Sequence, residues 1–390
     1  MKIVSFIALL LVTQAPSLLW AETYYVDVAN GNDAGKGSRE QPFKTTSKGI
    51  GAAQAGDTVE ILKVDFPIHE TLVVKNKSGQ PGRPIVIDGK GNLFTGSDPL
   101  KAEDWTEVKP GVFRNDHLLA NLTATTSANS SFILTRYYML WNGVQNRMGR
   151  SSKGYLPPLP PVDRLKAGEW TCVEAENAFY IAIEPGQKLA DSHIELPVRL
   201  NGVSVIGDCS HWVLRNINTT HVINDGFNIH ARTADFVFEN IIATECGDDG
   251  ISAHEESDII IHGLVSRHNS TGMAHISVMP SPVRSTCDRL VLEDNYAFNL
   301  LLENGEHVIS NSLVSAKAPK GGKDGIRLMH EFKDTTSRNL TVKFLNCQIP
   351  FPEGANPCGA PPFRVDYSVK LEVSPDTHLG GEITNLPPRN

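Results

Sequence analysis

The strongest constraint on the fold of this 390-residue chain is an internal repeat in its second half. Five short segments that alternate apolar and polar residues carry the repeat: 212–216 (WVLRN), 236–240 (FVFEN), 259–263 (IIIHG) and, less regularly, 290–294 and 307–311. The first three segments follow one another at nearly equal steps along the chain. A near-constant step of this size is typical of repeat proteins, in which each unit packs only on its neighbours.

A second set of segments lies between the first. Asp225 begins DGFNIH, Asp249 begins DGISAH and Asp324 begins DGIRL. The units contain short β-rich runs separated by glycine and polar turns, with no amphipathic helical pattern. The leucine spacing of a leucine-rich repeat is absent, and a β-sandwich would not explain the repeated step. The sequence therefore predicts an all-β fold, a parallel β-solenoid, and the usual chirality of parallel crossovers makes it right-handed.

The repeat frame also predicts where side chains point. The inward-facing residues are Phe227, Ile229, Ile251, Ile259 and Ile261. Asn216, Asn240 and Asn311 end their segments, where their amides can bond from one rung of the solenoid to the next.

The period sets the expected domain organisation. Residues 22–390 form one solenoid domain after a signal peptide at 1–21. Its parts are an N-terminal cap with the first rungs (22–100), an irregular β-rich excursion (101–200), regular rungs (202–349) and a proline- and glycine-rich tail along the outside (350–390).

The first residues resemble a secretory signal peptide. Lys2 precedes an apolar run over 3–12, and a cleavage site follows Ala21. The run is too short to span a bilayer, so no membrane span is expected in the mature chain. The mature chain is expected to be exported and monomeric. A net charge of −8 without a basic run gives no reason to expect a nucleic-acid partner.

Export permits disulfides, and the chain has six cysteines. Six cysteines allow about 15 pairings. Cys347 and Cys358 flank a proline- and glycine-rich loop and are the expected pair, while buried thiols are the alternative for the others.

The mature N-terminus combines a strand, a glycine- and asparagine-rich loop, a short helix and a second strand over 23–62. Together with the rungs at 202–349 it resembles secreted right-handed parallel β-helix proteins, many of which are polysaccharide lyases or hydrolases. The resemblance implies that the helix caps the open end of the solenoid, where backbone groups would otherwise be unpaired.

Three aspartates are expected to meet on neighbouring rungs. Asp225 and Asp249 occupy equivalent positions, and Asp248 adjoins the second. Strands of a sheet lie about 4.8 Å apart, so the three carboxylates should converge on one hard cation. Calcium takes about six to eight oxygen ligands with flexible geometry, which makes Ca²⁺ the expected ion. The alternative is a solvated turn, since Asp-Gly is a common turn dipeptide.

The segment NDGF…GDDGI (224–251) resembles two kinds of β-helix active site. In calcium-dependent pectate lyases, aspartates on successive rungs hold the metal and a lysine is the base. Polygalacturonases, which are hydrolases, pair an Asn-x-Asp-Gly turn with a Gly-Asp-Asp turn. Here no residue separates Asn224 from Asp225, no histidine occurs at 270–272, and Met329 stands where that family has lysine.

A lyase also needs a base that removes a proton. Counting by alternation gives one outward column, namely Asn228, Ser252, His275, Asn299 and Arg327. The neighbouring column holds His230, His254 and Ser277. The candidate catalytic residues are therefore His275, Arg327, His254 and the lysines of the KAPKGGKD loop, Lys323 above all, with Lys317 and Lys320.

The expected function is action on an acidic polysaccharide by calcium-assisted β-elimination. Two alternatives stay open: a hydrolase of polygalacturonase type, and a non-catalytic carbohydrate-binding or surface solenoid with a structural calcium site. The choice of polysaccharide rests on fold analogy.

Overall fold

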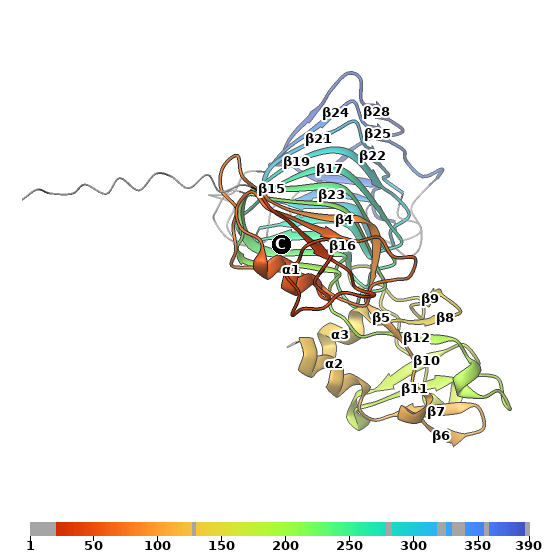
Figure 1. The fold of residues 1–390 in the computed structure, drawn as a ribbon. Helices are drawn as coiled ribbons and strands as arrows, with labels where there is room; N and C mark the ends of the chain where they lie inside the picture. Colours follow the sequence, from red (N-terminus) through yellow and green to blue (C-terminus); the bar gives the residue numbers. More distant parts are fainter. Residues whose placement is uncertain are drawn as a thin grey trace, which may run out of the picture.

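The structure is a computed structural model that describes residues 21–126, 130–277, 283–317, 325–329, 340–354 and 359–386. This part of the chain is mostly β-strand. Its largest part is a set of parallel strands stacked side by side and curled around (Figure 1). These strands enclose an apolar core. The predicted signal peptide spans residues 1–21. All of these except Ala21 lie outside the described residues.

The chain alternates between two ladders of parallel strands. The first ladder contains β1 (Thr23–Val26), β2 (Thr58–Ile61), β4 (Ile85–Thr95), β14 (Trp212–Thr220), the second half of β15 (Phe227–Thr244), β17 (Ser257–Arg267), β19 (Arg284–Leu292), β21 (Gly305–Ser310), β22 (Leu313–Val314), β24 (Leu340–Leu345), β25 (Gln348–Ile349), β27 (Lys370–Val373) and β28 (His378–Leu379). The second contains β3 (Leu72–Lys75), β13 (Val203–Asp208), the first half of β15, β16 (Asp249–His254), β18 (Thr271–Ile276), β20 (Phe298–Glu303), β23 (Ile326–Met329), β26 (Phe363–Asp366) and β29 (Thr384–Leu386).

The repeat in the sequence corresponds to the number of residues between neighbouring strands within each ladder. In the second ladder Phe227 lies between Val203 and Ile251, which stand equally far before and after it in the chain. In the first ladder Phe236 lies between Trp212 and Ile259. The prediction of parallel strands that recur at the period of the sequence is confirmed.

The core lies between the ladders. The five residues predicted to point inward, Phe227, Ile229, Ile251, Ile259 and Ile261, all have an exposed fraction of 0%. The ring of Phe227 meets that of Phe238 edge-on, with centroids 5.8 Å apart. The period-2 alternation thus predicted the buried face correctly.

The asparagines that end the repeat segments stand at local kinks of the first ladder, Asn216 inside β14, Asn240 inside β15 and Asn311 between β21 and β22. Asn216, Asn240 and Asn311 have φ of 55°, 50° and 50°, a left-handed conformation that asparagine adopts more readily than most residues. The amide Nδ2 of Asn311 donates to Asp288 Oδ1 at 2.7 Å, and Asn346 Nδ2 donates to Asn311 Oδ1 at 2.7 Å. The predicted hydrogen bonding of the amides from one rung to the next is confirmed at Asn311, whereas Asn216 and Asn240 lie at kinks within continuous strands.

The predicted N-terminal helix is α1 (Thr46–Ala52). The hydroxyl of Thr45 caps its first turn by accepting from Lys48 N. Ile50 is buried in the core, and a Cβ on Gly49 would lie 2.7 Å from a methyl carbon of Val26. The helix therefore packs directly on the first strand.

The excursion at 101–200 leaves the period, as predicted, and is β-rich. Its strands are β6 (Thr106–Lys109), β7 (Val112–Asn115), β8 (Met139–Trp141), β9 (Val144–Asn146), β10 (Trp170–Val173), β11 (Ala178–Ala182) and β12 (Ile194–Pro197). Together with β5 (Ser97–Pro99), which comes just before the excursion, they form two four-stranded antiparallel sheets. Its helices are α2 (Leu118–Thr126), α3 (Ser130–Arg136) and the 3-10 turns Ala102–Asp104, Val162–Arg164, Glu174–Glu176 and Leu189–Asp191.

The α-helices of the excursion were not predicted. They cover an apolar cluster built around Tyr137, Trp170 and Phe179, whose rings contact one another. The excursion thus has a core of its own. Ile223, which lies between β14 and β15 of the stacked parallel ladders (called the coil below), contributes to it. That the chain forms a single domain stays a prediction.

The expectation that 350–390 lies along the outside is wrong. Its strands β26, β27, β28 and β29 continue the two ladders as far as Leu386. Parallel pairing here covers backbone groups that would otherwise form an open sheet edge, which explains why the proline- and glycine-rich segment coils with the rest.

The cysteines Cys172, Cys209, Cys246, Cys287 and Cys347 form no disulfide with one another. The predicted partner of Cys347, Cys358, lies outside the described residues. Within the described residues, no helix has the length and apolarity needed to cross a membrane.

We expect the core at β15 to dominate local stability. Phe227→Ala should lower the free energy of unfolding by about 3–5 kcal/mol, because it leaves a cavity in a fully buried position. Ile242→Ala, on the same strand but 36% exposed, is the matched control and should cost about 1 kcal/mol or less. Denaturant unfolding of both variants measures the difference, and equal losses would contradict this account of the core.

Candidate functional site

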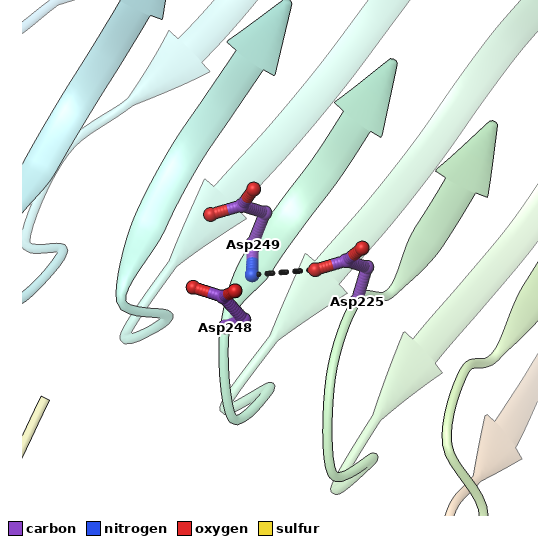
Figure 2. Close-up of side chains that lie close together, drawn as sticks. All are labelled: Asp225, Asp248 and Asp249. Carbon is purple, nitrogen blue, oxygen red and sulfur yellow. Dashed lines mark hydrogen bonds between the residues drawn. The ribbon is translucent and has the colours of Figure 1, made fainter. Parts of the chain in front are cut away.

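The three aspartates lie at the start of neighbouring strands in the second ladder. Figure 2 shows Asp225 just before β15, and Asp248 and Asp249 where β16 begins. The backbone N–H of Asp249 donates to Asp225 Oδ1 at 3.0 Å, and one oxygen from each carboxyl lies within 4.8 Å of the others. The sequence thus predicted this convergence correctly.

Glycines make the close approach possible. A Cβ on Gly226 would lie 2.7 Å from the carbonyl oxygen of Gly250, and a Cβ on Gly250 would lie 2.0 Å from Ser266 Oγ. Neither position has room for a side chain, so the Asp-Gly dipeptides are required by packing between rungs.

Asp225 is hydrogen-bonded by two neutral side-chain amides. Its Oδ2 accepts from Asn224 Nδ2 at 2.9 Å and from Asn228 Nδ2 at 2.6 Å. Burial, followed by the charges of Asp249 and Asp248, raises the pKa of Asp225 to about 8. Burial and the neighbouring carboxylates therefore favour the protonated form of Asp225.

Asp248 is bound by two cations from the excursion. Arg136 Nη2 lies 2.8 Å from Asp248 Oδ2, and Lys153 Nζ lies 3.2 Å from Asp248 Oδ1. Ser152 Oγ donates to the same Oδ1. Burial alone would raise the pKa of Asp248, but Lys153 and Arg136 outweigh it and hold the pKa well below its usual range. Asp248 is therefore ionised.

Asp249 shares Lys153 with Asp248, since Lys153 Nζ also contacts Asp249 Oδ1. Burial and the charge of Asp248 raise the pKa of Asp249 to about 6 in spite of this contact. Burial would lower the pKa of Lys153, but the charges of Asp248 and Asp249 outweigh it and raise this pKa above its usual value. Lys153 is a protonated cation in this site.

The excursion is fixed to the coil beside these cations. Tyr138 OH donates to the carbonyl of Glu245 at 2.8 Å, and Gln145 Nε2 donates to the same carbonyl at 2.9 Å. Arg147 Nη1 donates to the carbonyl of Gly247 at 3.0 Å, and its guanidinium lies 4.8 Å from the ring centroid of Tyr296. These bonds hold the segment that carries Lys153 against the turn that carries Asp248.

Arg136, Ser152 and Lys153 were missed by sequence reasoning. They come from the excursion, where the period gives no frame that would place one residue next to another. The adjacent like charges of Asp248 and Asp249 were the one sign in the sequence that positive charge must lie nearby.

The aspartates line a cavity of about 370 Å³ together with Arg136, Lys153 and His254. His254, a predicted catalytic residue, stands at the far end of β16, and its Nε2 lies 2.9 Å from Ser252 Oγ. Burial, with the neighbouring His230 second, lowers the pKa of His254 to about 3. Its imidazole is therefore neutral at physiological pH.

The predicted position of His275 in the outward column is wrong. Ser252 pairs with Ala274, and His275 pairs with Ala253 on the inward side. His275 is 0% exposed, and its Nε2 lies 2.9 Å from Ser257 Oγ. The step from Ser252 to Ala274 is one residue shorter than the step from Phe236 to Ile259 in the first ladder, so a count at the latter step runs past Ala274 to His275, on the opposite face.

Irregular steps misplaced two other residues of the predicted columns. Asn299 is 0% exposed near the start of β20, and Leu301 takes its place beside Ala274. Ile276, in place of Ser277, pairs with His254.

Arg327 does lie in the outward column, paired with Leu301. Its guanidinium packs over the ring of Phe298, 4.9 Å from the centroid, and the residue is 7% exposed. β18 and β20 separate it from Ser252, a distance of about 14 Å at about 4.8 Å per strand. The structure therefore does not bring Arg327 to the aspartates.

The predicted base Lys323 lies outside the described residues, as does Lys320. Lys317 is described and stands at the end of the segment after β22.

The fit of calcium to this cluster is restricted. Three carboxylate oxygens within 4.8 Å of one another suit a hard cation. However, the ammonium group of Lys153 already lies against Asp248 and Asp249, so an ion bound between them would have to displace it. As the side chains stand, two of the three carboxylates are not free for a divalent cation.

Comparison with known proteins identifies the fold but no family. No family model matches the chain. A solved glycoside hydrolase superposes with a TM-score of 0.52 at 11% identity, covering 94% of this chain and 96% of that one. Pectate lyase Pel9A gives a TM-score of 0.40 at 13% identity, over 92% of this chain and 78% of that one.

Among curated proteins, the uncharacterized protein YwoF of Bacillus subtilis (strain 168) is 33% identical over 105 residues. The match covers 26% of this chain and 22% of YwoF, so it spans a minor part of either protein. The chain shares the fold of the glycoside hydrolase, and at this identity the likeness extends to the fold alone.

The raised carboxyl pKa values predict a pH-dependent stability. Between pH 3.8, the ordinary carboxyl value, and about 8, the folded protein retains a proton on Asp225 that the unfolded chain has released. This contribution to stability is present in full below that range and is lost as the pH rises through it. Because Asp225→Asn removes this titration, the melting temperature of the variant relative to the parent should rise from pH 4 to pH 8.

Thermal unfolding followed by circular dichroism at several pH values measures this change. Asp65→Asn, at an exposed loop position, is the control and should show no such trend. An Asp225→Asn difference that is constant with pH would mean that Asp225 is ionised in the folded protein.

Proposed function

We propose that this protein is a carbohydrate-active enzyme that hydrolyses a glycosidic bond of an acidic polysaccharide at the Asp225–Asp249 pair. The observation that carries the proposal is the placement of these neighbouring carboxyls in one cavity, where the amides of Asn224 and Asn228 donate to Asp225 and the ammonium group of Lys153 contacts Asp249. Burial and the neighbouring carboxylates raise the pKa of both carboxyls. Two carboxyls in different environments can serve as acid and base. One oxygen of each lies within 4.8 Å of the other, so the attacking water would lie beside the pair and not between its members.

In the proposed reaction, Asp225 donates its proton to the glycosidic oxygen as the bond from that oxygen to the anomeric carbon breaks. Asp249 accepts a proton from the water that attacks this carbon. Proton exchange with solvent then returns Asp225 to its protonated form and Asp249 to its carboxylate. Asp248 stays ionised and fixes Lys153, which in turn orients the carboxylate of Asp249.

The charges in the cavity are compatible with an acidic substrate. Lys153 and Arg136 each carry one positive charge, Asp248 and Asp249 each carry one negative charge, and protonated Asp225 is neutral. The net charge of these five side chains is therefore zero, although the net charge of the whole chain is −8. A uronate can therefore enter without a bound metal to screen the aspartates.

The fold supports a carbohydrate substrate by analogy. We propose that the alternating ladders close into a right-handed parallel β-helix, that the protein is exported, and that it acts as a monomer. The glycoside hydrolase with the TM-score of 0.52 carries its activity on the same fold, which makes a sugar substrate the first to test.

Calcium-assisted β-elimination is the second candidate. The close group of three buried carboxylate oxygens favours it. It would require Lys153 to leave Asp248 and Asp249, and a base to take the proton at C5 of the uronate. Among the described residues lining the cavity, Lys153 is held protonated by the aspartates and so is not suited to that role. A non-catalytic binding protein is the third possibility.

One assay separates the three. The protein is incubated with polygalacturonate, alginate, hyaluronan and neutral xylan, each with added calcium and with a chelator. We expect new reducing ends from an acidic polysaccharide, without absorbance from an unsaturated product and without dependence on calcium. Calcium-dependent absorbance would instead indicate elimination. Retention of a polysaccharide without cleavage would indicate binding only.

Asp249→Asn should lower kcat by about 10²–10⁴ fold, the usual contribution of a general base. Asparagine keeps the shape of the side chain, so KM and the circular dichroism spectrum should change little. Asp258→Asn, at the second residue of β17 and outside the cluster, is the control and should keep the parental kcat. A variant at Asp249 with parental turnover would contradict the proposed role of the pair.

A further inference from the structure

The outward face of the second ladder carries a column of apolar and aromatic side chains beside the aspartate cavity. Its members are Ile206, His230, His254 and Ile276, from the consecutive strands β13, β15, β16 and β18. Outward positions on a solvated sheet are ordinarily polar. Ile206 is nevertheless 39% exposed, and His230 is exposed as well.

The two histidines of this column are stacked. Their ring centroids are 4.4 Å apart, with an angle of 16° between the planes. Burial is the largest cause lowering the pKa of each ring, so both are neutral at physiological pH. The pair therefore presents an uncharged aromatic surface with polar nitrogens at its rim.

A polar column runs alongside. Ser204, Asn228 and Ser252 occupy the outward positions two residues before Ile206, His230 and His254 on the same three strands. Asn228 and Ser252 line the aspartate cavity. An apolar strip next to a row of hydroxyl and amide groups is complementary to a pyranose ring, which has a C–H face and hydroxyls at its edge.

His230 connects two hollows of this face. It lines the aspartate cavity and also a second, shallower cavity of about 430 Å³, together with Arg232, Glu255 and Asp208. A molecule longer than one sugar can therefore extend from the aspartates over the histidine rings toward Arg232.

We propose that His230 and His254 form a sugar-binding platform. It holds a sugar unit of the glycan chain that neighbours the glycosidic bond to be cleaved. The C–H face of this sugar packs on the imidazole of His230, and Asn228 and Ser252 contact its hydroxyls. The platform positions the substrate and takes no part in proton transfer. The inference rests on the proposed function for its ligand class, but it concerns binding and is separable from catalysis.

The test compares His230→Ala, His230→Phe and His262→Ala. His262 is the matched control, because it also stands on an outward position but in the first ladder, on β17. Affinity electrophoresis measures retardation in gels that contain polygalacturonate, alginate, hyaluronan or xylan. Steady-state kinetics on a glycan that the parent cleaves measures KM and kcat.

We expect His230→Ala to weaken retardation and to raise KM about tenfold with a nearly unchanged kcat, as for loss of uniform binding. His230→Phe should restore most of the binding, because it keeps an aromatic face, and His262→Ala should match the parent. A merely structural histidine pair would give equal KM values in all three variants, which would overturn the platform.

The binding and catalytic outcomes are distinguishable. Retardation of the parent that His230→Ala reduces, without cleavage of any glycan, would support the platform and refute the proposed hydrolysis. Cleavage with a KM that does not respond to His230→Ala would refute the platform and leave hydrolysis standing. Failure of the parent to be retarded by any of the four glycans would also refute the platform.

Discussion

The parallel backbone pairing between rungs is the constraint on which the rest of this structure depends. Because each rung repeats the register of the one before it, residues one period apart, such as Phe227 and Ile251, become neighbours. The same pairing stacks apolar side chains into a continuous core and stacks Asp225 beside Asp249 at its surface. The pairing provides the core that stabilises the fold, and the site is a consequence of it.

The charge that this stacking concentrates has to be balanced. Three buried carboxyls would be unstable together if all were ionised and unpaired. The excursion balances this charge by placing Arg136 and Lys153 against Asp248, and the raised pKa of Asp225 favours its uncharged form. The excursion therefore does more than cover the coil, since it determines which carboxyl is ionised and which can donate.

Sequence reasoning succeeded where the period was strict. Phe227 and Ile251 were placed inside, and the three aspartates together, because both inferences need only a repeat length and the alternation of a strand. It failed at His275 because the step from Ser252 to Ala274 is short, and a miscount by a single position reverses the face that alternation assigns. Lys153 could not be found at all, because contacts between the excursion and the coil depend on tertiary packing that no period encodes.

The location of the site follows from the same difference between strict and irregular steps. From Val203 through Phe227 to Ile251 the second ladder advances twice by the same step, without a shift in register. Beyond Ile251 the step to Met273 is shorter than this, and the following step to Leu300 is longer. Carboxyls can act as a pair only if equivalent side chains point to the same face on neighbouring rungs, and a slip by a single position would turn one of them into the core. The regular rungs are therefore the part of the coil in which such a pair can form, and on the next rung the residue that pairs with Asp249 is Thr271, which has no carboxyl group.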